Sequence, residues 1–346
     1  MDEFDPIDHW FDKGFRIEKT KRPKSAAKRA ITRPQSTFTA PAGAIKFSKL
    51  AKTKNIKSVI NKAPEVVVKI TGKSNGLKTL KNHLDYISRN GKLELQDENG
   101  QPLIGRQDIN KLLIGLKEKK IPEDSKHREY IHVLFSMPAN TPESQLKASV
   151  QQFCKEEFSN RNYVMAYHDD TDHSHMHVAV STRDKNIPLI IGGEERLSPR
   201  KNDLFRWRQG FADKLRENGI DAAASERRHR FNYRKSENAT VRQIKDKTSN
   251  TPQVTKELAD EIKTALKTGI RPTNPALAKA EANKKEALEG WQKVAENLDA
   301  SGDPELAKKV RAFMAEADKP IVTRNQEIYD KAQEKDLGKE YVELDL

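Results

Sequence analysis

The stretch YVMAYHDDTDHSHMHVAVS, residues 163–181, decides the fold prediction. Two runs rich in aromatic and β-branched residues flank a charged turn, which predicts a β-hairpin. Side chains alternate along a strand, and residues facing each other across a strand pair lie about 5 Å apart at Cβ. We therefore expect His168 opposite His175, with His177 two residues further along on the same face. The alternate apolar residues of the second strand face the core.

This hairpin predicts a metal site. Three neutral imidazoles that share a divalent ion leave it coordinatively open, as in catalytic rather than structural sites. We expect His168, His175 and His177 to hold a divalent ion. Asp170 could fix the tautomer of one imidazole, and His173, in the turn, is an additional candidate. A run of surface histidines without a ligand is the competing interpretation, which the third histidine across the strand pair disfavours.

A helix before Gly91 carries a candidate nucleophile. Its apolar stripe consists of Leu77, Leu80, Leu84 and Ile87. At about 100° per residue, Tyr86 lies roughly 140° from the centre of that stripe, on the polar side. Arg89 and Lys92 follow as candidate phosphate contacts, and a tyrosine exposed beside them could act as a nucleophile. Core packing is the alternative, weakened because the core face is already occupied.

A further strand is predicted over residues 129–137, because every second side chain from Ile131 to Met137 is apolar. His132 and Ser136 fall on the face opposite to the apolar one. That face of the sheet could also carry the histidine cluster and form a DNA-binding surface. His132 is therefore a further candidate for the metal site.

Composition indicates a polyanionic partner. The net charge is +13, and lysines and arginines on phosphates release condensed counterions. Cys154 is the single cysteine, which excludes a disulfide framework and a cysteine-based zinc site and suits a reducing compartment. We see no secretory signal and no run of 18 apolar residues, so we expect a cytosolic protein without membrane insertion.

The chain is expected to have three parts. Residues 1–60 predict a flexible basic arm, residues 61–235 the catalytic domain, and residues 236–346 a linker and a helical region with few bulky anchors.

Together, these motifs resemble the HUH-type relaxases of conjugative and mobilisable plasmids, in particular the P-type branch that includes the T-DNA border endonucleases. The resemblance runs from about residue 66 to 230. It implies an α+β fold, with an antiparallel-sheet HUH endonuclease domain, helices packed on one face, and a helical C-terminal appendage. It assigns the nucleophile to Tyr86 and a divalent metal, Mg²⁺ or Mn²⁺ with Zn²⁺ as an alternative, to the three histidines. Ser136 would lie near the DNA 3′ side of the nick.

The implied function is site- and strand-specific nicking and closing of the origin of transfer, through a 5′ phosphotyrosine adduct that pilots the strand in conjugation. Implied partners are single-stranded origin DNA, relaxosome accessory proteins, a coupling protein and a type IV secretion system. The protein would work in the bacterial cytoplasm and be translocated with DNA to the recipient. Because a free phenol is protonated at neutral pH, it needs a proton acceptor, for which Asp85 and Asp170 are candidates.

Two alternatives remain open at this point. An HUH replication initiator or transposase would use a second tyrosine, for which Tyr163 and Tyr167 are nearest. A non-enzymatic origin-binding accessory protein would use the histidines for a structural zinc.

Overall fold

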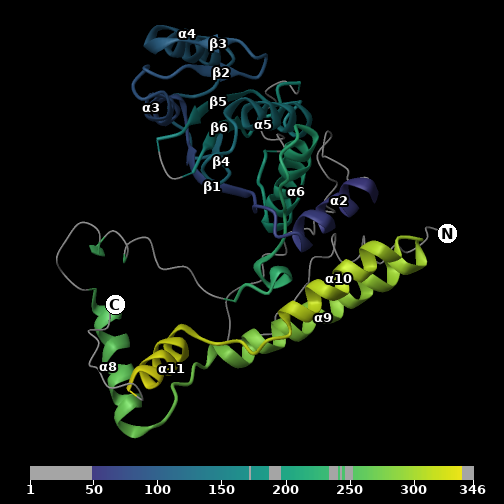
Figure 1. The fold of residues 1–346 in the computed structure, drawn as a ribbon. Helices are drawn as coiled ribbons and strands as arrows, with labels where there is room; N and C mark the ends of the chain where they lie inside the picture. Colours follow the sequence, from purple (N-terminus) through teal and green to yellow (C-terminus); the bar gives the residue numbers. More distant parts are fainter. Residues whose placement is uncertain are drawn as a thin grey trace, which may run out of the picture. The chain divides into compact units, whose positions relative to one another are not determined.

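The computed structural model describes residues 49–170, 173–186, 196–233, 241, 244–245 and 252–336. They form two compact units, of which one ends at Ser225 and the other begins at Glu226 (Figure 1). The expected arm over residues 1–48 lies outside the described residues. Along the described segments, no helix combines the length and apolar character that crossing a membrane requires.

The first unit is built on a six-stranded sheet with the strand order β1-β4-β6-β5-β2-β3, in which every neighbouring pair is antiparallel. The strands are β1 (Val67–Ser74), β2 (Leu95–Asp97), β3 (Pro102–Leu103), β4 (Tyr130–Ser136), β5 (Tyr163–His168) and β6 (His175–Ser181). The expected antiparallel α+β fold is confirmed. The short strands β2 and β3 had not been predicted, because two or three residues carry no periodic signal.

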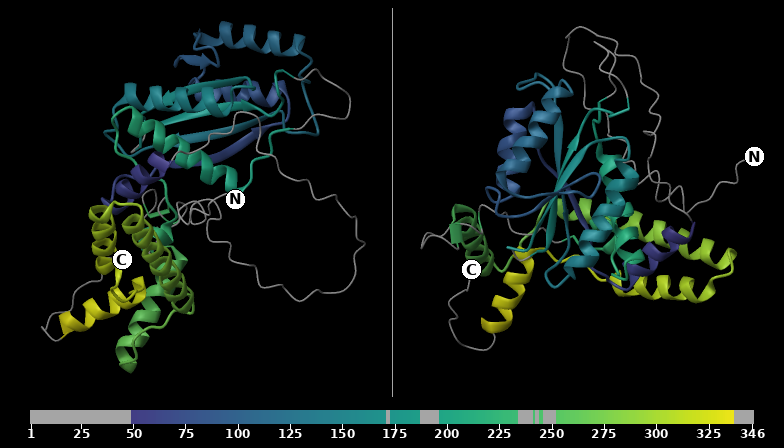
Figure 2. Two further views of the ribbon diagram at one scale, coloured as in Figure 1. Left: turned by 90° about the vertical axis from the view of Figure 1, so that its right-hand side faces the viewer. Right: turned by 90° about the horizontal axis from the view of Figure 1, so that it is seen from above.

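Helices cover both faces of this sheet (Figure 2). The helices are α3 (Leu77–Ile87), α4 (Gly105–Glu118), α5 (Glu143–Glu157) and α6 (Lys201–Glu217). On one face, α5 and α6 bury a core with the apolar side chains of the central strands, such as Val133 and Val178. On the other, the stripe of α3 packs with α4 and with alternate residues such as Tyr130 and Ala179. The expectation of helices on one face is therefore wrong, since the histidine-bearing face is also apolar over much of its length.

The segment from Lys49 to Ile60 is helix α2 and belongs to the first unit. Its Ile56 is fully buried, and Asn55 exchanges two hydrogen bonds with the backbone of Ala224, at 2.8 and 2.9 Å. The prediction of a flexible arm is wrong for these residues. Their weakly amphipathic, lysine-rich sequence gives no local sign of this packing.

The second unit is helical. Its elements are η1 (Arg227–Arg230), α8 (Gln253–Thr268), α9 (Ala276–Ala300), α10 (Pro304–Ala317) and α11 (Arg324–Asp336). The indole N–H of Trp291 in α9 donates to the carbonyl oxygen of His229, at 2.7 Å, and the Trp291 ring lies 5.3 Å from that of Phe313 in α10. These contacts attach η1 to the helical unit, so the expected boundary at residue 235 lies about ten residues too late.

Candidate active site

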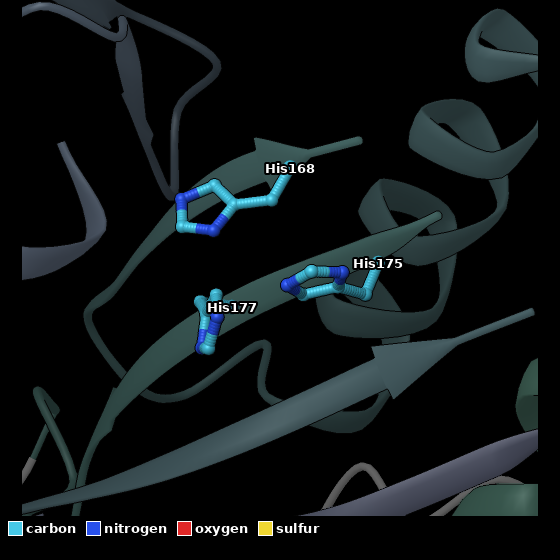
Figure 3. A group of neighbouring side chains, drawn as sticks. All are labelled: His168, His175 and His177. Carbon is cyan, nitrogen blue, oxygen red and sulfur yellow. The ribbon is translucent and has the colours of Figure 1, made fainter. Parts of the chain in front are cut away.

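The β5–β6 hairpin brings three imidazoles together (Figure 3). In the observed register His168 faces His175, and Ala166 faces His177, as expected from the alternation. The ring centroids lie 5.2 Å apart for His168 and His175, 4.8 Å for His168 and His177, and 5.1 Å for His175 and His177. One nitrogen from each ring lies within 4.8 Å of the other two, which is a separation that one ion can bridge.

Hydrogen bonds orient two of these rings. His168 Nε2 lies 2.7 Å from the carbonyl oxygen of Ile87, and His175 Nδ1 lies 2.8 Å from that of His173. A carbonyl only accepts, so these two nitrogens carry the protons. Nδ1 of His168 and Nε2 of His175 are therefore the unprotonated nitrogens, and backbone carbonyls orient metal-binding histidines in this way.

The third ring also suits a metal ligand. His177 Nδ1 is buried and has no hydrogen-bond partner among the described residues. Burial, with charge on His168 and His175, lowers the pKa of His177 to about 3, and burial chiefly lowers the pKa of His168. Both imidazoles are therefore neutral at neutral pH, which is the form that binds a metal. The donor set fits a divalent ion.

Tyr86 lies beside this group, on the polar side of α3. The residue is 59% exposed, and its ring centroid is 6.2 Å from that of His177 in an edge-on arrangement. The Arg89 guanidinium lies 5.4 Å from the centre of the Tyr86 ring. The phenol is thus accessible to a polymer that also reaches the imidazoles.

Arg89 links the tyrosine to the histidines. Its Nη2 lies 3.2 Å from His168 Nδ1 and is paired with the Asp170 carboxylate. Burial disfavours the charged form, but hydrogen bonds with Asp170 and the Tyr86 side chain outweigh it and raise the pKa of Arg89. The backbone of Arg89 is left-handed, with φ 52°, a conformation rare for a residue with a side chain.

Neither expected proton acceptor lies free beside the phenol. Asp170 pairs with Arg89, and no hydrogen bond joins it to an imidazole among the described residues, contrary to the expected tautomer-fixing role. The hydrogen bond from Arg89 lowers the pKa of Asp170, which weakens it as a base. Asp85 Oδ2 is 2.8 Å from the Lys81 ammonium, one turn back on α3.

The remaining predicted residues fall around this group. His173 is exposed and is not one of the three clustered histidines, although its carbonyl oxygen supports His175. Ser136 is 8% exposed and faces His175 across the β4–β6 pair, so the expected shared face of the two strands is confirmed. Lys92 is exposed in the segment after α3. His132 lies on the same face but outside the group of three.

His83, on the same side of α3 as Tyr86, was not among the predicted site residues. The His83 ring stacks on that of His132, with centroids 3.4 Å apart. Burial, with charge on His132, lowers the pKa of His83 to about 3, and burial, with charge on His177, lowers that of His132 to about 4. The i, i+3 spacing of His83 and Tyr86 on one helix side was the available signal.

Comparison with known proteins fits this geometry. Residues 102–220 match the model of the relaxase nuclease domain of the MobA/VirD2-like kind. The chain resembles the MobA/VirD2-like relaxases. It is 30% identical over 211 residues to the T-DNA border endonuclease VirD2 of Agrobacterium fabrum, covering 52% of this chain and 46% of the relative.

A second VirD2 relative gives a similar picture. The chain is 32% identical over 139 residues to the T-DNA border endonuclease VirD2 of Rhizobium rhizogenes, covering 35% of this chain and 31% of the relative. The matches to both relatives thus span less than half of their length. The relaxase-domain match itself includes β4 and the histidine hairpin and begins after Tyr86.

Proposed function

We propose that this protein is a relaxase, a site- and strand-specific DNA nicking and closing transesterase that acts at an origin of transfer. The observation that carries the proposal is the exposed Tyr86 phenol, whose ring lies 6.2 Å from that of His177 beside three clustered imidazoles. The similarity to border endonucleases supports a DNA substrate, as does the net charge of +13.

In the proposed reaction, Tyr86 Oη attacks the scissile phosphorus. The Oη–P bond forms while the bond from phosphorus to the 3′ oxygen breaks, which yields a 5′ phosphotyrosine and a 3′ hydroxyl. The phenolic proton leaves to a base or solvent, and the departing 3′ oxygen gains one. Since one phosphodiester replaces another, attack by a 3′ hydroxyl reverses the step and releases Tyr86.

The chain's own residues have separate tasks in this step. The three imidazoles would hold a divalent ion, which supplies Lewis-acid neutralisation of charge on the scissile phosphate. Arg89 sits against the Tyr86 ring and would stabilise negative charge that develops on the scissile phosphate. Ser136 would lie near the DNA 3′ side of the nick, and Lys92 would contact a phosphate. Asp170, as the proton acceptor, would first have to leave Arg89.

A relaxase of this kind would work with single-stranded origin DNA, relaxosome accessory proteins, a coupling protein and a type IV secretion system. It would act in the bacterial cytoplasm, stay bound to the 5′ end and travel with the strand into the recipient. The expected nuclease domain was residues 61–235. We propose that the nuclease also includes α2 and ends at Ser225.

The two-tyrosine alternative has less support. Tyr163 and Tyr167 face Val180 and Met176 across the hairpin, on the side opposite to His175 and His177. Both pack with the core formed by α5 and α6. A second nucleophile on that face would not reach a phosphate beside the imidazoles.

The test is adduct formation. The full chain is incubated with Mn²⁺ or Mg²⁺ and a 3′-labelled pool of single-stranded oligonucleotides, and the protein-linked label is counted after denaturation. We expect an adduct that EDTA abolishes, that added Mn²⁺ restores, and that is absent from Tyr86→Phe. Adduct from Tyr86→Phe at full yield would refute the assignment, and DNA binding with tightly held zinc but without cleavage would favour the accessory-protein alternative.

A further inference from the structure

His83 and His132 form a parallel pair of imidazoles next to the candidate metal site. Their ring centroids lie 3.4 Å apart and their planes differ by 1°. His83 belongs to α3, one turn before Tyr86, whereas His132 lies in β4, the strand next to β6. The pair therefore connects the helix that carries the tyrosine with the sheet that carries the three histidines.

His132 is held from the side of β1. Its Nε2 lies 2.9 Å from the hydroxyl oxygen of Ser74. The β1–β4 register shifts between Ile70 and Gly72, and a Cβ at Gly72 would lie 3.0 Å from His132 Nδ1. A side chain at position 72 would press on the ring, so Gly72 leaves it room. The His132 ring is thus held in place, and the His83 ring stacks on it.

His83 in turn contacts the reacting group and a proposed ligand. Its ring centroid lies 6.5 Å from that of Tyr86 and 6.3 Å from that of His177, which it meets edge-on. The buried Nε2 of His83 has no hydrogen-bond partner among the described residues. The ring is therefore held by its face, through the stack, and not by a bond at this nitrogen.

We propose that His83 is a positioning residue, which through its stack on His132 fixes the Tyr86 phenol and the His177 imidazole relative to each other. The proposal rests on the proposed function, in which Tyr86 attacks a phosphate bound near His177. Reacting atoms must approach to about 3–3.5 Å, and a misplacement of about 1 Å can cost about 100-fold in rate. The phenol ring also lies against the Arg89 guanidinium, but it is His83, and not Arg89, that stacks on His132 in β4.

The experiment compares the full chain with its His83→Ala and His83→Phe variants. We expect His83→Ala to weaken Mn²⁺ binding, measured by titration calorimetry, by about tenfold. It should slow adduct formation by about 100-fold while affinity for the oligonucleotide stays within about threefold. His83→Phe keeps a flat ring on His132 and should restore both to within about threefold of the unmodified chain. His127→Ala, at an exposed histidine outside the site, is the matched control and should change neither.

Two results would overturn the inference. One is unchanged Mn²⁺ affinity in His83→Ala. The other is a folded His83→Phe, with an unaltered melting temperature, that is as defective as His83→Ala. If the unmodified chain binds Mn²⁺ but forms no adduct, the proposed function fails, and the Mn²⁺ affinities of the variants alone decide the role of His83.

Discussion

The three imidazoles of the candidate metal site are held in different ways. His168 and His175 each donate a proton to a backbone carbonyl, from Ile87 and His173, whereas the buried Nδ1 of His177 has no partner among the described residues. His177→Ala should therefore remove a ligand without freeing a backbone group. Loss of a residue that hydrogen-bonds to a metal ligand typically lowers metal affinity by about 10- to 100-fold. We expect His177→Ala, which removes a ligand itself, to lower Mn²⁺ affinity by more than that. Calorimetric titration measures this, and an affinity equal to that of His127→Ala would contradict a ligand role.

Glu129 offers a test of stability at the residue scale. Its side chain is fully buried and accepts hydrogen bonds from Arg183 and Arg196, at 2.6 and 2.9 Å. Removing one partner of a buried ion pair costs about 3–5 kcal/mol, so we expect Glu129→Gln to lower the free energy of unfolding by about 3 kcal/mol. Glu143→Gln, which breaks only the exposed pair with Lys147, should cost at most about 1 kcal/mol. Urea denaturation compares the two, and equal losses would contradict the prediction.

The same carboxylate predicts a pH dependence. Burial alone would raise the pKa of Glu129, but its hydrogen bonds with the two arginines outweigh burial and lower it. The folded chain therefore binds this proton less readily than the unfolded chain. The stabilisation by Glu129 is complete above the pKa of an unfolded glutamate, about 4.3, and is lost as the pH falls through the lower folded value. As the pH falls, the melting temperature of Glu129→Gln should fall less steeply than that of the unmodified chain. Equal slopes would show that Glu129 does not cause this pH dependence.

At the scale of elements, the start of α3 determines where Tyr86 lies. Gly76 precedes this helix, and a Cβ there would lie 2.2 Å from the backbone oxygen of Glu123. The next residue, Leu77, donates to the carbonyl oxygen of Pro122 at 3.0 Å, so the two segments are in direct contact. A side chain at position 76 must push them apart and move α3 over the sheet.

We therefore expect Gly76→Ala to destabilise the protein by about 1–3 kcal/mol and to slow adduct formation. Gly115→Ala is the control, since its Cβ would meet nothing within 4 Å in helix α4. Alanine there should stabilise by about 0.5–1 kcal/mol. Thermal denaturation and the adduct rate check both variants, and a Gly76→Ala protein as stable and active as the original would show that the contact is unimportant.

At the scale of the whole molecule, the first unit contains everything that its core and candidate site need. Both sheet cores and all three imidazoles lie between residues 49 and 225. We expect a fragment of residues 49–225 to unfold cooperatively and to bind Mn²⁺ as tightly as the full chain. A fragment of residues 61–225 lacks α2 and so loses the buried Ile56 and Val59 and the two hydrogen bonds of Asn55. It should be less stable by about 3 kcal/mol or more; equal melting temperatures would mean that α2 contributes nothing.

Local periodicity in the sequence was enough to determine the strands of the hairpin, the apolar stripe of α3 and the face shared by His168, His175 and His177. These features depend on side-chain directions that repeat every 2 or 3.6 residues, so neighbouring residues specify them. The tertiary structure alone decided that His83 meets His132, that Asp170 pairs with Arg89, that α2 packs within the first unit and that helices cover both faces of the sheet. Each of these contacts joins residues far apart in the chain. Which residues meet depends on burial and charge across the whole folded unit, and a local sequence pattern does not contain that information.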